Sequence, residues 1–393
     1  MYDDSEERLL LEVLRSGRWW FGGRVKQFEE EFAAFQGARF GVSCTNGTTA
    51  IEMGLRALGV LEGDEVIVPP YTFIATASAV VTVGAIPVFA DIEPGTLCLD
   101  PEDVARKITG RTRAVVPVHV AGRMADMERI NAIAGRHKLA VLEDAAHAWG
   151  SRSRGQGAGT LGQCGTFSFQ VSKNITAGEG GILLTDDPDL ADLCRSYTHC
   201  GRRRGSAWYD HDYLGSNLRM TEFQAAVLIA QLRRLEAQVR RRQANAALLD
   251  QLLPGMPGLR ILDPAARMTR RSYHMYVFRV DEPALGMSRD RMIEALVAEG
   301  VPVSKGWYRP LYRNSVFAQA HCGPAHGIRA PLAGKGVDYT RVSCPVSEQV
   351  CRDAIWIPQH VLLAEESQIR TLAAAVEKVI HHAVELNTGR GSD

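Results

Sequence analysis

Two residues in one stretch of the chain, Asp144 and Lys173, are of types that could carry chemistry together. Asp144 ends an apolar run that begins at Val141, and Lys173 follows a second apolar run, Gly165 to Gln170. The glycine-rich segment 178–181 comes next, which is typical of backbone packed closely against a ligand. A lysine amine can hold pyridoxal 5'-phosphate as a Schiff base, while a carboxylate keeps its pyridine nitrogen protonated. The pair therefore predicts a site for this cofactor, although a lone lysine is usually a surface residue.

A second feature, near the start of the chain, could bind an anion. The predicted strand Phe40–Cys44 turns through residues 45–49 into a segment with apolar residues at helical spacing. The first N–H groups of a helix have no partner within it, so they attract phosphate groups. An ordinary helix cap, which Thr and Asn often supply, is the alternative interpretation.

The elements that must position these residues alternate between short strands and helices from Phe40 to Asp144. This alternation is typical of an α/β domain with a mostly parallel sheet. Ligands of such sheets lie at the carboxyl ends of the strands. Segments 46–49 and 71–73, together with His119 and Asp144, all fall at such ends. We therefore expect them to form a single site.

The chain divides into two expected domains. The large α/β domain spans residues 1–253 and ends in a long helical pattern that begins near Met220. A Pro- and Gly-containing boundary follows, after which residues 254–386 are expected to form a smaller α+β domain. Residues 387–393 are expected to be a flexible polar tail.

Composition excludes several classes of protein. The 393 residues carry 45 basic and 45 acidic side chains, so bulk charge does not favour a nucleic-acid partner. The eight cysteines form no CxxC pair, and scattered histidines give no metal-ligand spacing, so no metal is expected. No signal peptide and no apolar run of membrane-spanning length is recognised, which predicts a cytoplasmic protein with no membrane partner.

One glycine pattern is a false lead. Residues 157–162 match GxGxxG, the pattern of dinucleotide-binding loops. That fingerprint needs a strand before it and a helix after it. Here a polar loop precedes the pattern and a predicted strand, Gly165 to Gln170, follows, so we reject dinucleotide binding.

Several ordered motifs resemble one known family over nearly the whole chain, the DegT/DnrJ/EryC1/StrS aminotransferases of fold type I. The motifs are Thr45-Asn46-Gly47-Thr48, Pro70-Tyr71-Thr72-Phe73, Glu143-Asp144-Ala145-Ala146-His147, Phe167-Ser168-Phe169 with Lys173, Gly178-Glu179-Gly180-Gly181 and Gly215-Ser216-Asn217-Leu218-Arg219. The resemblance implies a pyridoxal-phosphate-dependent aminotransferase.

The resemblance also implies catalytic roles for single residues. Lys173 would bind the cofactor and move the proton, and Asp144 would pair with the pyridinium nitrogen. His147 matches a position that touches the ring hydroxyl, and Phe73 matches the aromatic residue that stacks on the ring. Some relatives carry His where Lys173 stands and use the cofactor for dehydration, so the lysine favours transamination.

Further residues match the family's phosphate site. The backbone of Gly47 and Thr48 and the hydroxyl of Ser168 would hold the phosphate. Asn217 matches an asparagine that reaches the phosphate from the neighbouring subunit, which implies a homodimer with shared active sites.

Within the family, some stretches resemble members that aminate carbocycles, such as scyllo-inosose-type aminotransferases and 3-amino-5-hydroxybenzoate synthases. This likeness implies transfer of an amino group from glutamine or glutamate to a ketone of a cyclitol or related ring, in secondary metabolism. Amination of a nucleotide-linked keto-deoxysugar, or amination followed by dehydration, are the alternatives. A cofactor-binding regulator without turnover is a third hypothesis, although the sequence has no added DNA-binding segment.

Overall fold

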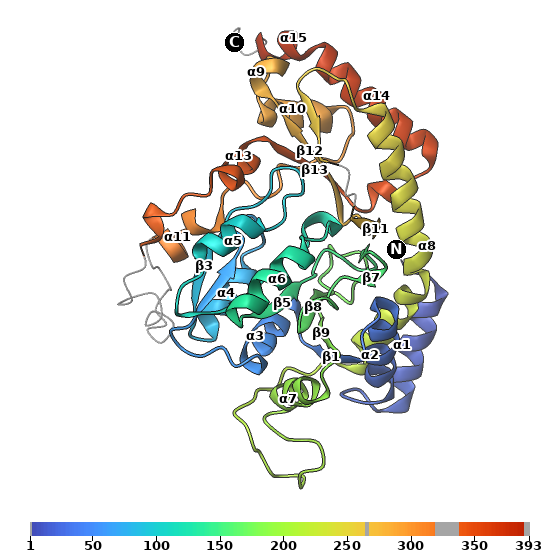
Figure 1. Cartoon of the computed structure of the whole chain (residues 1–393). Helices are drawn as coiled ribbons and strands as arrows, with labels where there is room; N and C mark the ends of the chain where they lie inside the picture. Colours follow the sequence, from blue (N-terminus) through green and yellow to red (C-terminus); the bar gives the residue numbers. More distant parts are fainter. Residues whose placement is uncertain (1, 264–266, 319–337, 389–393) are drawn as a thin grey trace.

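A seven-stranded sheet forms the centre of the computed structural model, which describes residues 2–263, 267–318 and 338–388 (Figure 1). The strands lie in the order β1-β9-β8-β5-β4-β2-β3. Their bounds, in that order, are Phe40–Cys44, Gly181–Thr185, Cys164–Ser168, Ala140–Asp144, Thr112–Val115, Glu65–Val68 and Ile86–Phe89.

Six of these strands run in one direction, and β9 runs antiparallel to both of its neighbours, β1 and β8. Every residue of β2, β8 and β9 is buried, as expected for strands covered on both faces. The predicted α/β class with a mostly parallel sheet is therefore confirmed.

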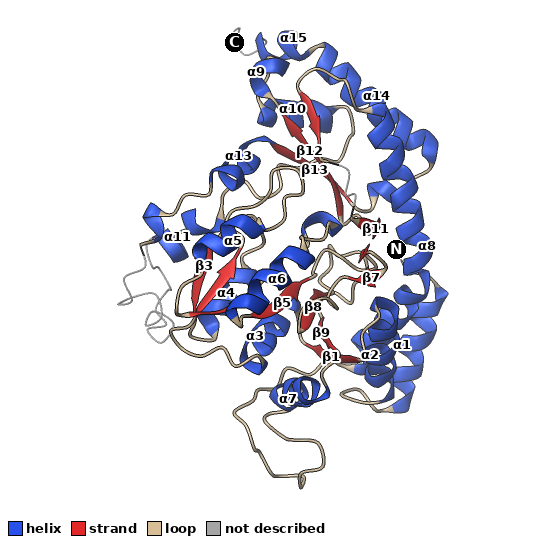
Figure 2. Ribbon diagram, viewed as in Figure 1, coloured by secondary structure: helices blue, strands red, loops and turns tan. Residues whose placement is uncertain are grey.

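Helices connect these strands and pack against the sheet (Figure 2). They are α3 (Gly47–Ala57), α4 (Ala75–Thr82), α5 (Pro101–Lys107), α6 (Met127–His137) and α7 (Pro188–Thr198), with a short turn η1 (Val120–Gly122). Short pairing segments β6 (Arg152–Ser153) and β7 (Gln156–Gly157) join β11 (Met268–Arg270) in a separate small sheet. The sheet's core and its connections thus come mainly from the first half of the chain.

One long helix, α8 (Glu222–Leu252), runs along the side of the molecule (Figure 1). Its 31 residues begin with a capping box, in which Thr221 and Gln224 satisfy each other's backbone N–H groups. Its first part packs on the N-terminal helices α1 (Asp4–Ser16) and α2 (Gly23–Gln36), and it also contacts α14 (Glu366–His381). It therefore joins the two ends of the chain.

The C-terminal part contains an antiparallel sheet of β10 (Leu259–Ile261), β12 (Met275–Val280) and β13 (Ala354–Pro358). Its remaining elements are α9 (Glu282–Leu285), α10 (Arg289–Ala298), η2 (Leu311–Arg313), α11 (Ser315–Ala318), η3 (Tyr339–Arg341), α13 (Pro345–Asp353), η4 (Val361–Leu363), α14 and α15 (Ala383–Thr388). The final helical pattern is interrupted at His382, and residues 389–393 of the expected tail lie outside the described residues.

Packing crosses the expected domain boundary in both directions. The last turns of α8, with Ala246 and Leu249, belong to the same apolar cluster as Ile355 of the C-terminal sheet. Tyr312 and Tyr339, from the C-terminal half, pack against Phe89 at the edge of the large sheet. The division at residue 253 stays a prediction. None of the helices in the described ranges is long and apolar enough to cross a membrane.

Candidate active site

A pocket of about 730 Å³ lies where the parallel strands end. It is reached by the segments that follow β1, β2, β4, β5 and β8, as expected for an open α/β sheet. Seven of the predicted site residues line it: Gly47, Thr48, Phe73, Asp144, His147, Ser168 and Lys173. The exceptions are Asn217 and His119, which was expected at the same edge but bonds to Glu143 instead. Sequence motifs more than a hundred residues apart thus form one cavity.

Asp144 lies at the end of β5 and is buried, with two hydrogen bonds to its carboxylate. The Thr76 hydroxyl donates at 2.8 Å and the Ala146 backbone N–H at 3.2 Å. Burial raises the pKa of Asp144, although these hydrogen bonds and the charge of Lys173 oppose that rise. A buried carboxylate in this state is ready to accept a cationic partner, such as a protonated pyridine nitrogen.

Lys173 follows β8 in a tight turn and reaches the pocket. Burial lowers the pKa of Lys173 from 10.5 to about 8, against the opposing effect of Asp144. The Nζ atom lies 5.8 Å from the centroid of the Trp149 ring. Roughly a tenth of the amine is therefore neutral at pH 7, far more than for an ordinary lysine, and the neutral form attacks carbonyl groups and accepts protons.

The N-terminus of α3 forms another part of the pocket wall. Asn46 caps the helix, since its side chain accepts the N–H of Thr49 at 2.9 Å. Ser168 approaches closely, because a Cβ atom at Gly47 would lie 2.8 Å from the Ser168 Cβ. Helix N–H groups and a serine hydroxyl converging on one place make a suitable cradle for a phosphate group.

His147 lies on the pocket wall in a stack of aromatic rings. Its ring is nearly parallel to that of Trp307, with 5.7 Å between centroids. Burial and then the nearby Lys173 charge hold the pKa of His147 well below its usual value. The Ala121 N–H donates to Nδ1 at 3.4 Å, so the proton of the neutral ring sits on Nε2. His147 can therefore donate one hydrogen bond into the pocket.

The C-terminal part adds His274, Trp307 and Trp356 to the pocket. The sequence gave no signal for Trp356, which lies within β13. The His274 ring lies 4.2 Å from that of His147, and Asn174 accepts its Nδ1 proton at 3.0 Å. Burial keeps the pKa of His274 well below its usual value. This half of the wall is therefore aromatic and uncharged.

Asn217 lies away from this pocket, at the end of the segment between α7 and α8. That segment projects from the body of the molecule (Figure 1). The Asn217 backbone forms an isolated β-bridge with His199. Trp208 and Leu214 in the same segment are 77% and 88% exposed. Within one chain, then, Asn217 is not brought to the other site residues.

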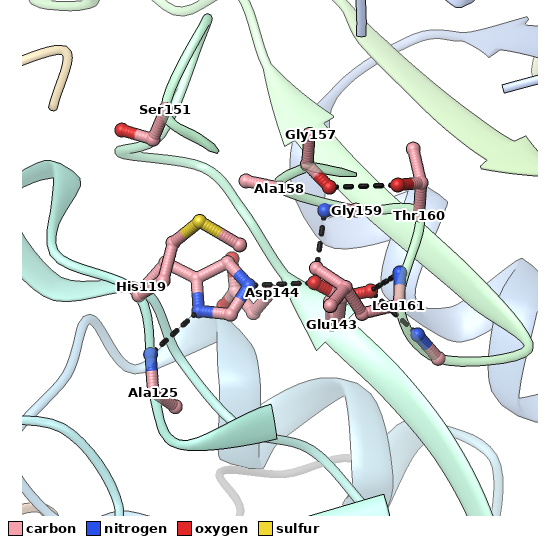
Figure 3. Close-up of polar contacts among 12 residues, drawn as sticks. His119, Ala125, Glu143, Asp144, Ser151, Gly157, Ala158, Gly159, Thr160 and Leu161 are labelled. Carbon is pink, nitrogen blue, oxygen red and sulfur yellow. Dashed lines mark hydrogen bonds and ion pairs between the residues drawn. The ribbon is translucent and has the colours of Figure 1, made fainter. Parts of the chain in front are cut away.

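Glu143, the residue before Asp144, faces a different environment (Figure 3). Its carboxylate accepts the backbone N–H groups of Gly159, Leu161 and Gly162 at 2.9, 2.6 and 2.7 Å. The Nε2 atom of His119 lies 2.7 Å from the Glu143 carboxylate. Nε2 carries the ring proton and donates it, because Nδ1 accepts the Ala125 N–H. The backbone of the GxGxxG segment thus binds the Glu143 carboxylate and not a dinucleotide. The described residues contain no cluster of side chains suited to hold a metal.

The sheet, with an acid and a lysine meeting at its carboxyl edge, defines a fold type I transferase. A sequence profile of the DegT/DnrJ/EryC1/StrS aminotransferase family matches residues 2–376. The chain belongs to this family, and it is therefore an aminotransferase of the pyridoxal-phosphate-dependent type.

Named relatives cover nearly the whole chain. A 3-amino-5-hydroxybenzoate synthase of Amycolatopsis mediterranei is 38% identical, over 97% of this chain and 96% of the relative. An L-glutamine:2-deoxy-scyllo-inosose aminotransferase of Streptoalloteichus tenebrarius is 39% identical, over 95% of this chain and 92% of the relative. The crystal structure of a 3-amino-5-hydroxybenzoic acid synthase superposes with a TM-score of 0.87 at 36% identity, covering 98% of each chain.

Proposed function

We propose that this protein binds pyridoxal 5'-phosphate and transfers an amino group from glutamine or glutamate to a ketone of a cyclitol or related carbocycle. The observation that carries the proposal is the single pocket lined by Asp144, Lys173, Ser168 and the start of α3. When bound, the cofactor supplies an electron sink for the carbon that gains or loses the amino group.

Each residue of the pocket has a role that follows from its chemistry. The Lys173 amine would bind the cofactor and carry the proton to and from the reacting carbon. The Asp144 carboxylate would keep the ring nitrogen protonated, and the buried negative charge would gain a partner in return. The Nε2–H of His147 would donate to the ring hydroxyl, and exposed Phe73 would cover one ring face.

The phosphate would be held by three groups from two elements. The backbone N–H groups of Gly47 and Thr48 lie at the positive end of α3, and the Ser168 hydroxyl stands beside them. No arginine lines the pocket among the described residues. Lys173 is the only lysine there, so within one chain the described residues form no basic groove for a diphosphate beside it. This favours an uncharged ring ketone over a nucleotide-linked sugar.

The names of the relatives support the same substrate class. One relative is named for amination of 2-deoxy-scyllo-inosose with L-glutamine, and another for synthesis of 3-amino-5-hydroxybenzoate. The second name keeps an aminating dehydratase as the alternative. Simple transamination and amination with loss of water are separated by the product, because the latter yields a conjugated ring with strong ultraviolet absorption.

The cofactor and donor are tested by absorption spectroscopy. Protein reconstituted with pyridoxal phosphate should show a visible band that is lost on adding glutamine or glutamate and returns with the correct ketone. Ketocyclitols and nucleotide-linked ketosugars are then compared as acceptors, with product mass as the readout. Absence of the band after reconstitution would contradict the cofactor, while return of the band with the ketosugar alone would contradict the substrate class.

A homodimer with shared sites is part of this proposal. Exposed Trp208 and Leu214, on the projecting segment that carries Asn217, are apolar side chains that a second copy would cover. Mixing inactive Lys173→Ala and Asn217→Ala variants after dissociation should restore activity, because one of the two sites in a mixed dimer would be intact. No restoration from a mixture proven to contain mixed dimers would contradict shared sites.

A further inference from the structure

A second cleft, of about 500 Å³, lies behind the wall of the active-site pocket. Residues from three parts of the chain line it, among them Arg123, Gln243, Asp250, Arg271 and Tyr273. Tyr273 lines this cleft while the next residue, His274, lines the active-site pocket. One short segment therefore separates the two cavities. We refer to the second as the Arg123–Arg271 cleft.

Arg123 is buried here without an acidic partner. Arg123 is only 4% exposed, and its Nη1 atom donates a hydrogen bond to the backbone oxygen of Asp263 at 2.7 Å. Its Nε has no hydrogen-bond partner among the described residues. Burial, followed by the positive charge of Arg271, lowers the pKa of Arg123 to about 9. The charge of Asp250 opposes this lowering only in part, and no acidic side chain of the described residues forms an ion pair with Arg123.

Arg271 is the second cation of the cleft, and it is only 8% exposed. Its guanidinium carbon lies 4.0 Å from the centroid of the Tyr273 ring, so the ring covers one face of the plane. Its Nε has no partner among the described residues. A guanidinium stacked in this way keeps its N–H edge free, and that edge matches two oxygens of a carboxylate or phosphate.

The acidic residues of the cleft do not neutralise these cations. No carboxylate oxygen of the described residues lies within 4.0 Å of either guanidinium. The Asp250 carboxylate accepts the Tyr276 hydroxyl at 2.7 Å. The Asp263 carboxylate packs against the backbone at Gly95. Buried arginines normally lie beside a negative group, since an unpaired buried charge is unfavourable.

We propose that the Arg123–Arg271 cleft binds a small oxyanion, the carboxylate or phosphate group of a metabolite, at a site separate from the active-site pocket. Arg271 would present its N–H edge to two oxygens and Arg123 would add its Nε–H. The neutral amide of Gln243 lines the same cleft and can donate a further hydrogen bond. Asp250 sets the orientation, because it repels the anionic end of the ligand.

Isothermal titration calorimetry with inorganic phosphate and with succinate tests this site, using protein saturated with pyridoxal phosphate. We expect the wild-type protein to bind at least one of the two at millimolar concentration or below. Arg271→Met should weaken that binding about tenfold or more, because charge-assisted hydrogen bonds are lost. Binding of phosphate alone would identify phosphate esters as the ligands, and binding of succinate alone would identify carboxylic acids.

Three further variants make the result specific. Arg123→Gln should weaken binding as Arg271→Met does, and the latter decides the test if Arg123→Gln does not fold. Arg260→Gln removes an exposed arginine of β10 that pairs with Asp281, and it should bind as wild type does. Ser168→Ala alters only the proposed phosphate cradle and should also retain this binding. Wild-type affinity in folded Arg271→Met, or no binding by the wild-type protein, would overturn the proposal.

Discussion

Glu143 and Asp144 are neighbours on one strand, yet their carboxylates face opposite environments. Three backbone N–H groups and the His119 ring surround Glu143, which is 0% exposed. Asp144 receives two hydrogen bonds and faces a cavity. Alternation along a strand sends consecutive side chains to opposite faces, so one residue joins the packed interior and the other the pocket.

The difference shows how a structural acid is told from a functional one. A buried carboxylate with a full set of donors is already stabilised and has nothing left to bind. A buried carboxylate with few donors has a raised pKa and gains most from a cationic ligand. Substitutions on the Glu143 side should therefore change stability, whereas substitutions on the Asp144 side should change chemistry.

The largest expected effect is on the pocket side, at Lys173. Lys173→Ala should abolish turnover, because no other amine lines the pocket among the described residues. Its free energy of unfolding should not fall for lack of a charge, because burial of the Lys173 amine is unfavourable near neutral pH. Steady-state transamination and urea unfolding are the measurements, and Lys138→Ala, outside the pocket, is the control. Wild-type turnover by Lys173→Ala would overturn the site assignment.

Glu143→Ala should give the largest loss of stability. It leaves three backbone N–H groups and the His119 Nε2 proton without an acceptor in the interior. Removing one partner of a buried charged network costs about 3–5 kcal/mol. Urea unfolding at neutral pH measures this loss. An unfolding free energy equal to that of wild type would break the contrast with Asp144.

Asp144→Asn should show the reverse pattern. The amide has the shape of the carboxylate but cannot hold a proton on the ring nitrogen. Activity should fall by about two orders of magnitude, as when a preorganised electrostatic contact is removed. The unfolding free energy of cofactor-free protein should change by less than about 1 kcal/mol. A loss of stability as large as that of Glu143→Ala would show that both acids are structural.

A smaller effect is expected from pH. The pKa of Lys173 is lowered to about 8 by burial, against 10.5 in the unfolded chain. The unfolded state therefore binds more protons between these values, so stability from this residue rises as pH increases from about 8 to 10.5. Between pH 8 and 10.5, the free energy of unfolding of cofactor-free wild type should rise by about 3 kcal/mol relative to that of Lys173→Met. A difference that is constant with pH would contradict the lowered pKa.

Much of the fold could be predicted because its signals are local. Strand Phe40–Cys44 has the predicted bounds, since a short apolar run is enclosed by turn residues on both sides. The sequence pattern predicts one final helix from Glu365 to Leu386, whereas the structure ends α14 at His381 and begins α15 at Ala383. A periodic pattern of apolar residues carries no signal for such a break, because it continues on either side of His382.

Site residues that lie in motifs at the ends of strands could be predicted from the sequence. Contacts that depend on the packing of distant segments were harder to predict. Asp144, Lys173 and the start of α3 were identified from the sequence, and the structure places them in one pocket. Thr76, which bonds to Asp144, lies four residues after Thr72, and that helical spacing was the only signal. The role of Glu143 was missed, because its partners come from a loop whose glycines suggested another kind of ligand.

Helix α8 has a mechanical consequence. At a rise of about 1.5 Å per residue it is a rod of roughly 46 Å, held at one end by α1 and α2 and at the other by the cluster around Leu249. If the C-terminal sheet, which carries Trp356 to the pocket, were to tilt, a straight α8 would carry that tilt as a sideways shift to its opposite end.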